Sequence, residues 1–191
     1  MTPYQLTGAT VGIVGYGEIG RNVARRLQGF EATILVHDPF VTEAEGVEVV
    51  SLEELLRRSD VVSLNVALTE GTTRLIGKDQ LALMKRDAVL VNTARGRVVD
   101  EDALLEALTT GSIRGAALDV LETEPPTPGR AAALAALPNV VLSPHIGGLS
   151  DRSALIMTEQ TIDCVLGVLR GDRPATLVNP EALEQTREVT A

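Results

Sequence analysis

Short apolar runs alternate with longer amphipathic stretches along the chain. The apolar runs are four to six residues long and contain mostly Val, Leu, Ile and Ala, without a regular polar alternation. Runs of this kind are typical of parallel strands that are buried on both faces. The pattern predicts strands at 10–14, 33–36, 61–66, 88–92, 116–119 and 140–143, and helices at 18–28, 51–59, 79–84, 100–110 and 150–170.

Local signals mark several of the helix ends. Ser51 and Glu54 form a capping box, in which Ser51 accepts the N–H of Glu54 and the Glu54 carboxylate reaches back. Gly111 and Gly171 follow two predicted helices and are expected to end them. The stretch 121–138 contains four prolines and an Ala-rich part, and it is predicted to be a long irregular connection.

Strands that alternate with helices predict an α/β fold. The expected architecture is a doubly wound parallel sheet with right-handed crossovers, a Rossmann fold in three αβα layers. At 191 residues, the chain is long enough for one well-cored domain and too short for two of ordinary size. We expect this domain to span residues 1–171.

Composition narrows the classes of partner. The chain has 26 acidic and 17 basic residues, a net charge of -9, and few aromatic residues, so nucleic acid and membrane surfaces are poor partners. No leader segment or membrane span is visible. Cys164 is the only cysteine, and no Cys/His spacing resembles a metal site. These features favour a cytoplasmic protein without a metal.

A glycine-rich turn follows the first predicted strand and opens the first helix. Gly15 permits the tight turn, Gly17 lets the backbone approach a pyrophosphate, and Gly20 lets the helix pack closely on the strand. The helix N-terminus then offers free N–H groups and the positive end of its dipole to phosphates. The residues expected beside those phosphates are Glu18, Ile19 and Arg21.

Asp38 selects among the dinucleotides. It stands eighteen positions after Gly20, at the end of the second predicted strand. A carboxylate there can accept from both ribose hydroxyls and would repel the 2′-phosphate of NADP. No Arg or Lys lies within Val36 to Thr42 to bind that phosphate, so NAD is the predicted cofactor.

Three further segments follow predicted strands, at the sheet edge where ligands bind. They are Asn92 to Asp100 (NTARGRVVD), Leu118 to Pro126 (LDVLETEPP) and Ser143 to Gly148 (SPHIGG). Together with the glycine turn and Asp38, and in this order, they resemble the D-2-hydroxyacid dehydrogenase family, which includes D-3-phosphoglycerate dehydrogenases. The resemblance runs from Leu6 to about Pro180.

The resemblance implies hydride transfer between NAD(H) and a 2-hydroxy or 2-keto acid, with a catalytic trio of Arg95, Glu124 and His145. His145 would exchange the proton, Glu124 would fix its tautomer, and Arg95 would bind the substrate carboxylate. Asp119 would accept from the nicotinamide carboxamide. The resemblance also places Val66, Thr93, Ala94, Arg95, His145, Gly147 and Gly148 against the cofactor.

The resemblance further implies a second, substrate-binding domain, most of which would precede Leu6. Residues 172–191 would form a tail that returns to it. Without that domain, we expect NAD binding with weak or undetectable dehydrogenase activity. A homodimer is expected, through the helix at 150–170 and the region from Val98 to Leu108. Two other interpretations stay open: a non-catalytic NAD-sensing module, and a domain that serves only in assembly.

Overall fold

The computed structural model describes residues 5–174. The chain divides into two compact units, Met1–Gly147 and Gly148–Ala191. The second unit contains a single described helix, α6 (Asp151–Arg170), which begins at the N-cap Ser150 and ends at Gly171, as predicted. No helix in the described part of the chain is both long enough and apolar enough to cross a membrane.

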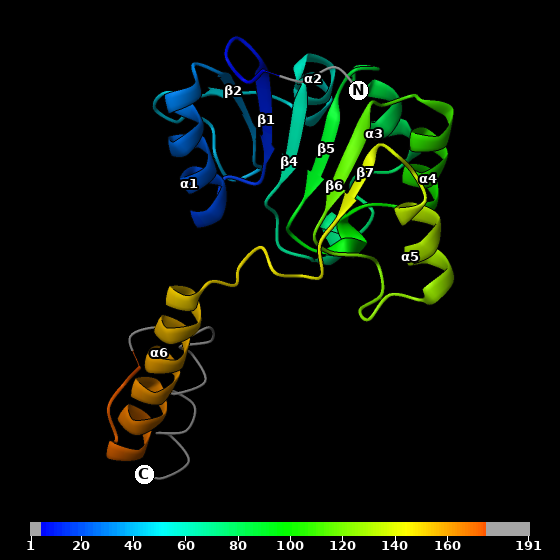
Figure 1. Cartoon of the computed structure of the whole chain (residues 1–191). Helices are drawn as coiled ribbons and strands as arrows, with labels where there is room; N and C mark the ends of the chain where they lie inside the picture. Colours follow the sequence, from blue (N-terminus) through cyan, green and yellow to red (C-terminus); the bar gives the residue numbers. More distant parts are fainter. Residues whose placement is uncertain (1–4, 175–191) are drawn as a thin grey trace. The chain divides into compact units, whose positions relative to one another are not determined.

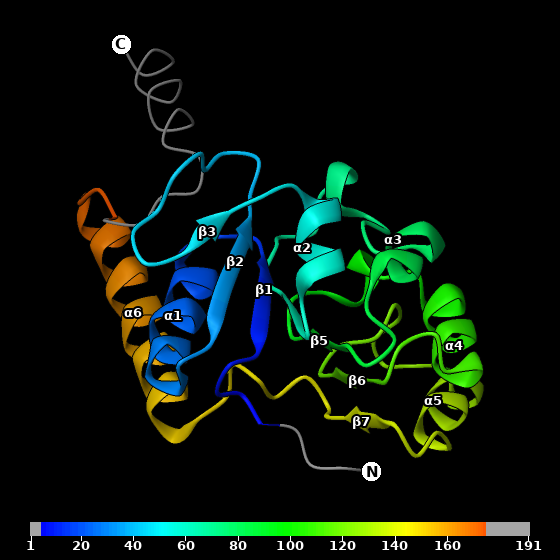
Figure 2. The ribbon, with the colours of Figure 1, turned by 90° about the horizontal axis from the view of Figure 1, so that it is seen from above.

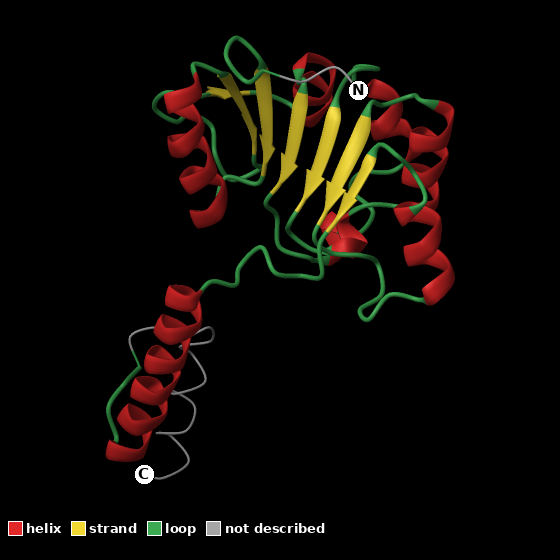
Figure 3. Ribbon diagram, viewed as in Figure 1, coloured by secondary structure: helices red, strands yellow, loops and turns green. Residues whose placement is uncertain are grey.

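The first unit is built on one seven-stranded parallel sheet (Figures 1 and 3). Its order is β3-β2-β1-β4-β5-β6-β7, so the chain winds outward from β1 in one direction and then from β4 in the other. The carboxyl ends of β1 and β4 therefore flank the topological switch point, where ligands bind in open sheets of this kind. The strands are β1 (Thr10–Val14), β2 (Thr33–His37), β3 (Glu48–Val49), β4 (Val61–Leu64), β5 (Val89–Asn92), β6 (Gly115–Leu118) and β7 (Val140–Leu142).

Five α-helices and three short 3-10 helices connect these strands. The α-helices are α1 (Glu18–Leu27), α2 (Leu52–Arg58), α3 (Lys78–Leu83), α4 (Glu101–Thr110) and α5 (Pro128–Ala135). The 3-10 helices are η1 (Gln28–Phe30), η2 (Glu70–Thr72) and η3 (Gly96–Val98).

Strand β1 shows how the sheet acquires two covered faces. Ile13 packs with Ala24 of α1, whereas the next residue, Val14, belongs to the larger cluster that contains Leu55 of α2. Successive side chains of a strand point to opposite faces, so α1 and α2 lie on opposite sides of the sheet. In Figure 2, β1 and β2 separate these two helices. The predicted α/β class and three-layer arrangement are confirmed.

The predicted irregular connection at 121–138 is wrong in part, because it contains α5. Pro128 occupies the first turn of this helix, where the missing N–H costs nothing and the fixed φ favours helix. Alanines follow it, and alanine has the highest helix propensity. Prolines therefore mark the start of a helix here and not only a break.

One smaller expectation also needs correction. Ser51 does accept the N–H of Glu54, at 3.1 Å, but the Glu54 carboxylate pairs with Arg58 at 2.7 Å, because the guanidinium is one turn further along the same helix. The apolar side chains between Val98 and Leu108 pack inside their own unit, since the apolar stripe of α4 faces the sheet. Ala103 and Leu105 are only partly buried, and the dimer expected through this region and the helix at 150–170 stays a prediction.

Candidate functional site

The functional residues follow from the register of the sheet. One row of paired residues crosses six strands: His37 (β2), Val14 (β1), Leu64 (β4), Asn92 (β5), Leu118 (β6) and Leu142 (β7). The next residue along each of these strands begins a connection at the carboxyl edge. Those residues, the edge row, are Asp38, Gly15, Asn65, Thr93, Asp119 and Ser143.

The glycine turn has the spatial requirements of a dinucleotide site. Gly15 has φ +91, and a Cβ on it would lie 2.8 Å from the backbone of Asn65. A Cβ on Gly20 would lie 2.1 Å from the carbonyl oxygen of Gly15, so the helix can approach the strand only because this residue is glycine. A Cβ on Gly17 would meet nothing within 4 Å, so this position faces open space. The turn therefore fits the pyrophosphate of NAD.

The N-terminus of α1 carries no side-chain cap. Its N-cap residue is Gly17, whereas Ser51 caps α2 and Asp100 caps α4 through side-chain hydrogen bonds. The first-turn N–H groups of α1 are thus left for an anionic ligand. Ile19 in this turn is 63% exposed, so its side chain is open to a ligand at the helix end.

Arg21 lies at the same helix end. Its guanidinium carbon is 5.6 Å from the centre of the Tyr16 ring, the distance of a cation–π contact. Tyr16 is 8% exposed, so the ring is fixed and restrains the guanidinium above it. The structure therefore keeps a positive charge beside the glycine turn.

Asp38 is held in place by the backbone. Its carboxylate accepts the N–H of Tyr16 at 2.7 Å and the N–H of Phe40 at 2.9 Å, one bond on each oxygen. Each oxygen keeps a further lone pair, which matches two ribose hydroxyl donors. The hydrogen bond from Tyr16 also links the predicted ribose site to the glycine turn.

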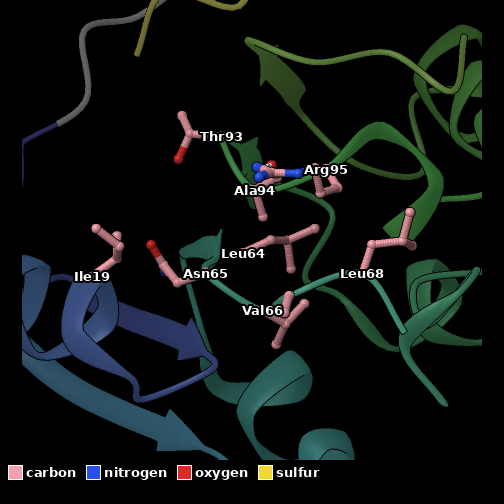
Figure 4. A pocket seen from close by; sticks show the side chains of 9 residues that line it. Ile19, Leu64, Asn65, Val66, Leu68, Thr93, Ala94 and Arg95 are labelled. Carbon is pink, nitrogen blue, oxygen red and sulfur yellow. Dashed lines mark hydrogen bonds between the residues drawn. The ribbon is translucent and has the colours of Figure 1, made fainter. Parts of the chain in front are cut away.

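A cavity of about 400 Å³ lies at the switch point. Figure 4 shows side chains from three connections around it: Ile19 after β1, Val66 after β4 and Arg95 after β5. Its other lining residues are Leu64, Asn65, Ala67, Leu68, Thr93 and Ala94. The cavity therefore joins the glycine turn to the predicted catalytic arginine.

Asn92 is a residue of this site that the sequence analysis did not single out. Its side chain is 1% exposed, accepts the N–H of Ala94 at 3.0 Å and donates to the carbonyl of Arg95 at 3.0 Å. These two bonds fix the turn that presents Arg95. The signal available in the sequence was a polar side chain at the last position of an otherwise apolar strand.

His145 and Glu124 form a hydrogen bond near the β7 end of the edge row. Nδ1 of His145 lies 2.8 Å from Oε2 of Glu124, although the residues are 21 positions apart. An ionised carboxylate can only accept, so Nδ1 carries the hydrogen and Nε2 of the neutral ring is left as an acceptor. His145 has φ +54, and its N–H donates to the carbonyl of Asp119 at 2.8 Å. That bond holds an uncommon backbone conformation.

Asp119 organises the connection that carries His145. Its buried carboxylate accepts from the hydroxyl of Ser143, the N–H of Ile146 at 3.0 Å and the N–H of Gly147 at 2.8 Å. Burial raises the pKa of Asp119, but these three hydrogen bonds outweigh it and bring the pKa below its ordinary value. Asp119 is therefore ionised at neutral pH, with both oxygens engaged by the protein.

A second cavity, of about 420 Å³, adjoins this pair. Its lining combines His145, Glu124 and Asp119 with the apolar surfaces of Leu121 and Pro144. Pro125, Pro126 and Ser143 complete it. The predicted proton-transfer pair thus faces a largely apolar space, which strengthens polar interactions made inside it.

The structure brings nearly all predicted site residues to one sheet edge, from the glycine turn and Asp38 to Thr93, Ala94, Arg95, Asp119, Glu124, His145 and Gly147. Gly148 is exposed and begins the second unit. Within residues 5–174, no group of three or more His, Cys, Asp or Glu side chains is arranged to hold a metal ion.

Comparisons with known proteins agree with this geometry. Residues 1–147 match the family model of the D-isomer specific 2-hydroxyacid dehydrogenase NAD binding domain. A glyoxylate reductase of Korarchaeum cryptofilum is 47% identical over 188 residues, which are 96% of this chain and 56% of that protein. A glycerate dehydrogenase of Methylorubrum extorquens is 41% identical over 175 residues, 92% of this chain and 54% of that protein.

Among solved structures, the NAD-complexed D-isomer specific 2-hydroxyacid dehydrogenase of Lactobacillus delbrueckii ssp. bulgaricus matches with a TM-score of 0.86 and 32% identity. The match covers 93% of this chain and 58% of that one. The chain spans about half the length of the curated relatives it matches.

Proposed function

Because the chain belongs to the D-isomer specific 2-hydroxyacid dehydrogenase family, as its NAD-binding domain, we propose that it holds NAD(H) for hydride transfer between a D-2-hydroxy acid and the corresponding 2-keto acid. The observation that carries this proposal is the His145–Glu124 pair, which lies on the same sheet edge as the glycine turn and Arg95. The cofactor supplies or receives the hydride. The chain supplies the remaining groups.

In the proposed reduction, the substrate oxygen gains a proton as its carbon gains the hydride. His145 gives this proton from Nε2, and the negative charge of Glu124 at Nδ1 stabilises the protonated ring. Arg95 binds the substrate carboxylate, because its planar fork matches a carboxylate and only one of its donors is engaged by the carbonyl of Ala94. In the oxidation, neutral His145 accepts the hydroxyl proton at the same atom.

The cofactor is bound by groups along the edge row. Glu18, Ile19, Gly20 and Arg21 adjoin the pyrophosphate, and Asp38 accepts from the ribose hydroxyls. Val66, Thr93, Ala94, Gly147 and Gly148 lie against the nicotinamide half. Asp119 acts there through the 143–147 connection that it holds, and any bond to the carboxamide uses a remaining lone pair.

A two-part experiment tests the proposal. First, NADH and NADPH are titrated into the chain, and we expect binding of NADH with clear preference over NADPH. Second, NADH bound to the chain is mixed with glyoxylate, hydroxypyruvate or pyruvate, and its oxidation is followed in a single turnover, so that slow activity is still detected. Replacing His145 with Ala should slow this step by about 100-fold or more.

The outcomes separate the alternatives. Failure to bind NADH contradicts the whole proposal and leaves only a role in assembly. NADH binding without oxidation by any of the three keto acids, when the chain is joined to the substrate-binding domain of a relative, contradicts the hydride-transfer step and favours an NAD-sensing module. We expect turnover by the chain alone to be weak, because it spans about half the length of its relatives and a cleft open to water disfavours hydride transfer.

We also propose that the protein is a cytoplasmic homodimer. The support for a dimer is the series of large apolar side chains exposed on α6, which includes Leu155, Ile162, Leu166 and Leu169. Sedimentation of the chain at micromolar concentration should give twice the monomer mass. Replacing both Leu155 and Leu166 by Gln should return it to a monomer.

A further inference from the structure

Glu101 is a buried carboxylate that the proposed reaction does not use. It is the first residue of α4, follows the Arg95 turn and is 4% exposed, which is rare for a glutamate. One carboxylate oxygen accepts the backbone N–H of Glu122, and the other lies 3.5 Å from Nε of Arg130. Burial raises the pKa of Glu101, although the bond from Glu122 and the charge of Arg130 act in the opposite direction. The negative charges of Glu122 and Asp102 also raise this pKa.

The bond to Glu122 lies two residues before Glu124. The residues that follow Glu124 are Pro125 and Pro126, which have no N–H and cannot anchor the connection through one. The Glu124 side chain is 40% exposed, so packing alone does not fix it. The connection therefore depends on an anchor on its upstream side.

Other contacts hold the same backbone from the same direction. A Cβ on Gly96 would lie 1.8 Å from the carbonyl oxygen of Leu121, so the segment after Arg95 rests directly on this connection. The carboxylate of Glu122 pairs with Arg74 at 3.3 Å. Between them, these contacts fix residues 121 and 122 against η3 and the segment before α3.

We propose that Glu101 is a positioning residue: by accepting the N–H of Glu122, it holds the 121–124 connection so that the Glu124 carboxylate meets Nδ1 of His145. The inference rests on the proposed function in one respect, because that function gives the His145–Glu124 pair its role in proton transfer. The geometry of the pair can nevertheless be read without substrate or NADH. A failed keto-acid assay and a failed test of Glu101 are therefore distinguishable.

The tautomer of His145 provides the measurement. A ring whose Nδ1 donates to Glu124 is held in the Nδ1–H form, whereas an unrestrained ring reverts toward the Nε2–H form, and ring ¹⁵N shifts distinguish the two at a pH where the ring is neutral. His37 is the internal reference, because its Nδ1 lies 3.1 Å from the carbonyl oxygen of Val50. The chain has only two histidines, so the spectra are simple.

Two conservative variants separate the reach of the carboxylate from its charge. Glu101→Asp keeps the charge beside Arg130 but withdraws the acceptor by one methylene, and we expect the ratio of Nδ1–H to Nε2–H forms at His145 to fall roughly fivefold or more, as for the loss of one hydrogen bond. Glu101→Gln keeps an oxygen acceptor for the N–H of Glu122, and Arg130 stays paired with Asp102. The tautomer ratio should therefore fall at most half as far in Glu101→Gln as in Glu101→Asp. His37 should not change in either variant.

Asp102→Asn is the matched control, because Asp102 also pairs with Arg130 but has a side chain that is 78% exposed. It should leave His145 unchanged, and thermal unfolding should show that all three variants are folded. The proposal is overturned if Glu101→Asp leaves the tautomer ratio at the wild-type value, or if Glu101→Gln or Asp102→Asn shifts it equally far. It is also overturned, without any variant, if the Glu122 amide hydrogen of the wild-type chain exchanges as fast as an unprotected one.

Discussion

At the scale of single residues, Asp38 and Asp119 show two uses of a carboxylate at the end of a strand. Asp38 is bonded to two backbone N–H groups and keeps lone pairs for a ligand. Asp119 uses its acceptors to hold the connection that carries His145. The sequence singled out Asp38 by its spacing after the glycine turn, and Asp119 through the family resemblance.

Asp38→Asn should weaken NADH binding by about 10- to 100-fold, the effect of losing charge-assisted hydrogen bonds. Binding of NADPH should fall less, because the carboxylate that repels the 2′-phosphate is gone. Fluorescence titration with both nucleotides measures the two affinities. Glu43→Gln, an exposed carboxylate in the connection after β2, is the control, and an equal loss in both variants would contradict the assignment.

Asp119→Asn should lower the free energy of unfolding at pH 7 by about 1–3 kcal/mol, since buried donors lose an ionised acceptor. The pKa of Asp119 in the folded chain is below the ordinary aspartate value of 3.8, so its contribution is present above that pH and is lost as pH falls through the folded-state pKa. Urea unfolding of wild type and variant should therefore converge below about pH 3.8. A difference that stays constant down to about pH 3 would be inconsistent with this role.

At the scale of elements, the sequence could predict the helices and strands whose ends are set by nearby residues. Apolar runs and end signals placed six of the seven strands and most helices within a residue or two, whereas the two-residue strand β3 (Glu48–Val49) was missed. The role of Glu101 was missed because it bonds a backbone N–H that folding brings near from 21 residues away. Asn92 bonds backbone groups only two and three residues ahead, but a polar residue at the end of an apolar run does not show which groups it will bond. Helix α5 was missed because proline both ends and begins helices.

Two substitutions in the glycine turn should separate effects on stability from effects on NADH binding. Gly17→Ala should leave the melting temperature nearly unchanged, since its Cβ would meet nothing within 4 Å, but should weaken NADH binding about 10-fold or more by obstructing the pyrophosphate. Gly20→Ala should reduce stability by about 1–3 kcal/mol as well, because its Cβ would collide with the carbonyl of Gly15. Melting curves with and without NADH test both. If Gly17→Ala binds NADH normally, the ligand does not approach this face.

At the scale of the whole molecule, the chain consists of two units with unequal shares of the site. All predicted site residues except Gly148 lie in the first unit, which has its own core. The division at Gly147 could not be predicted from the sequence, because the helical pattern of 150–170 does not show which unit the helix belongs to. The predicted tail at 172–191 lies mostly outside the described residues and stays a prediction.

Truncation tests this division. A chain of residues 1–147 should fold with a cooperative melting transition and bind NADH within about threefold of the affinity of the whole chain, a difference of less than about 1 kcal/mol. Circular dichroism and NADH titration provide the two readouts. A loss of NADH binding in a folded 1–147 chain would show that the second unit completes the cofactor site.

The edge row also sets a length scale for ligands. From β2, which Asp38 follows, to β7, which leads into the His145 connection, five strand spacings separate the two ends, about 24 Å in all. The width of the sheet therefore selects ligands by their length. A mononucleotide can engage Asp38 or the His145 side but cannot bridge them, so the adenosine half of a cofactor should bind alone and weakly, as a competitor that leaves the distant proton-transfer pair untouched.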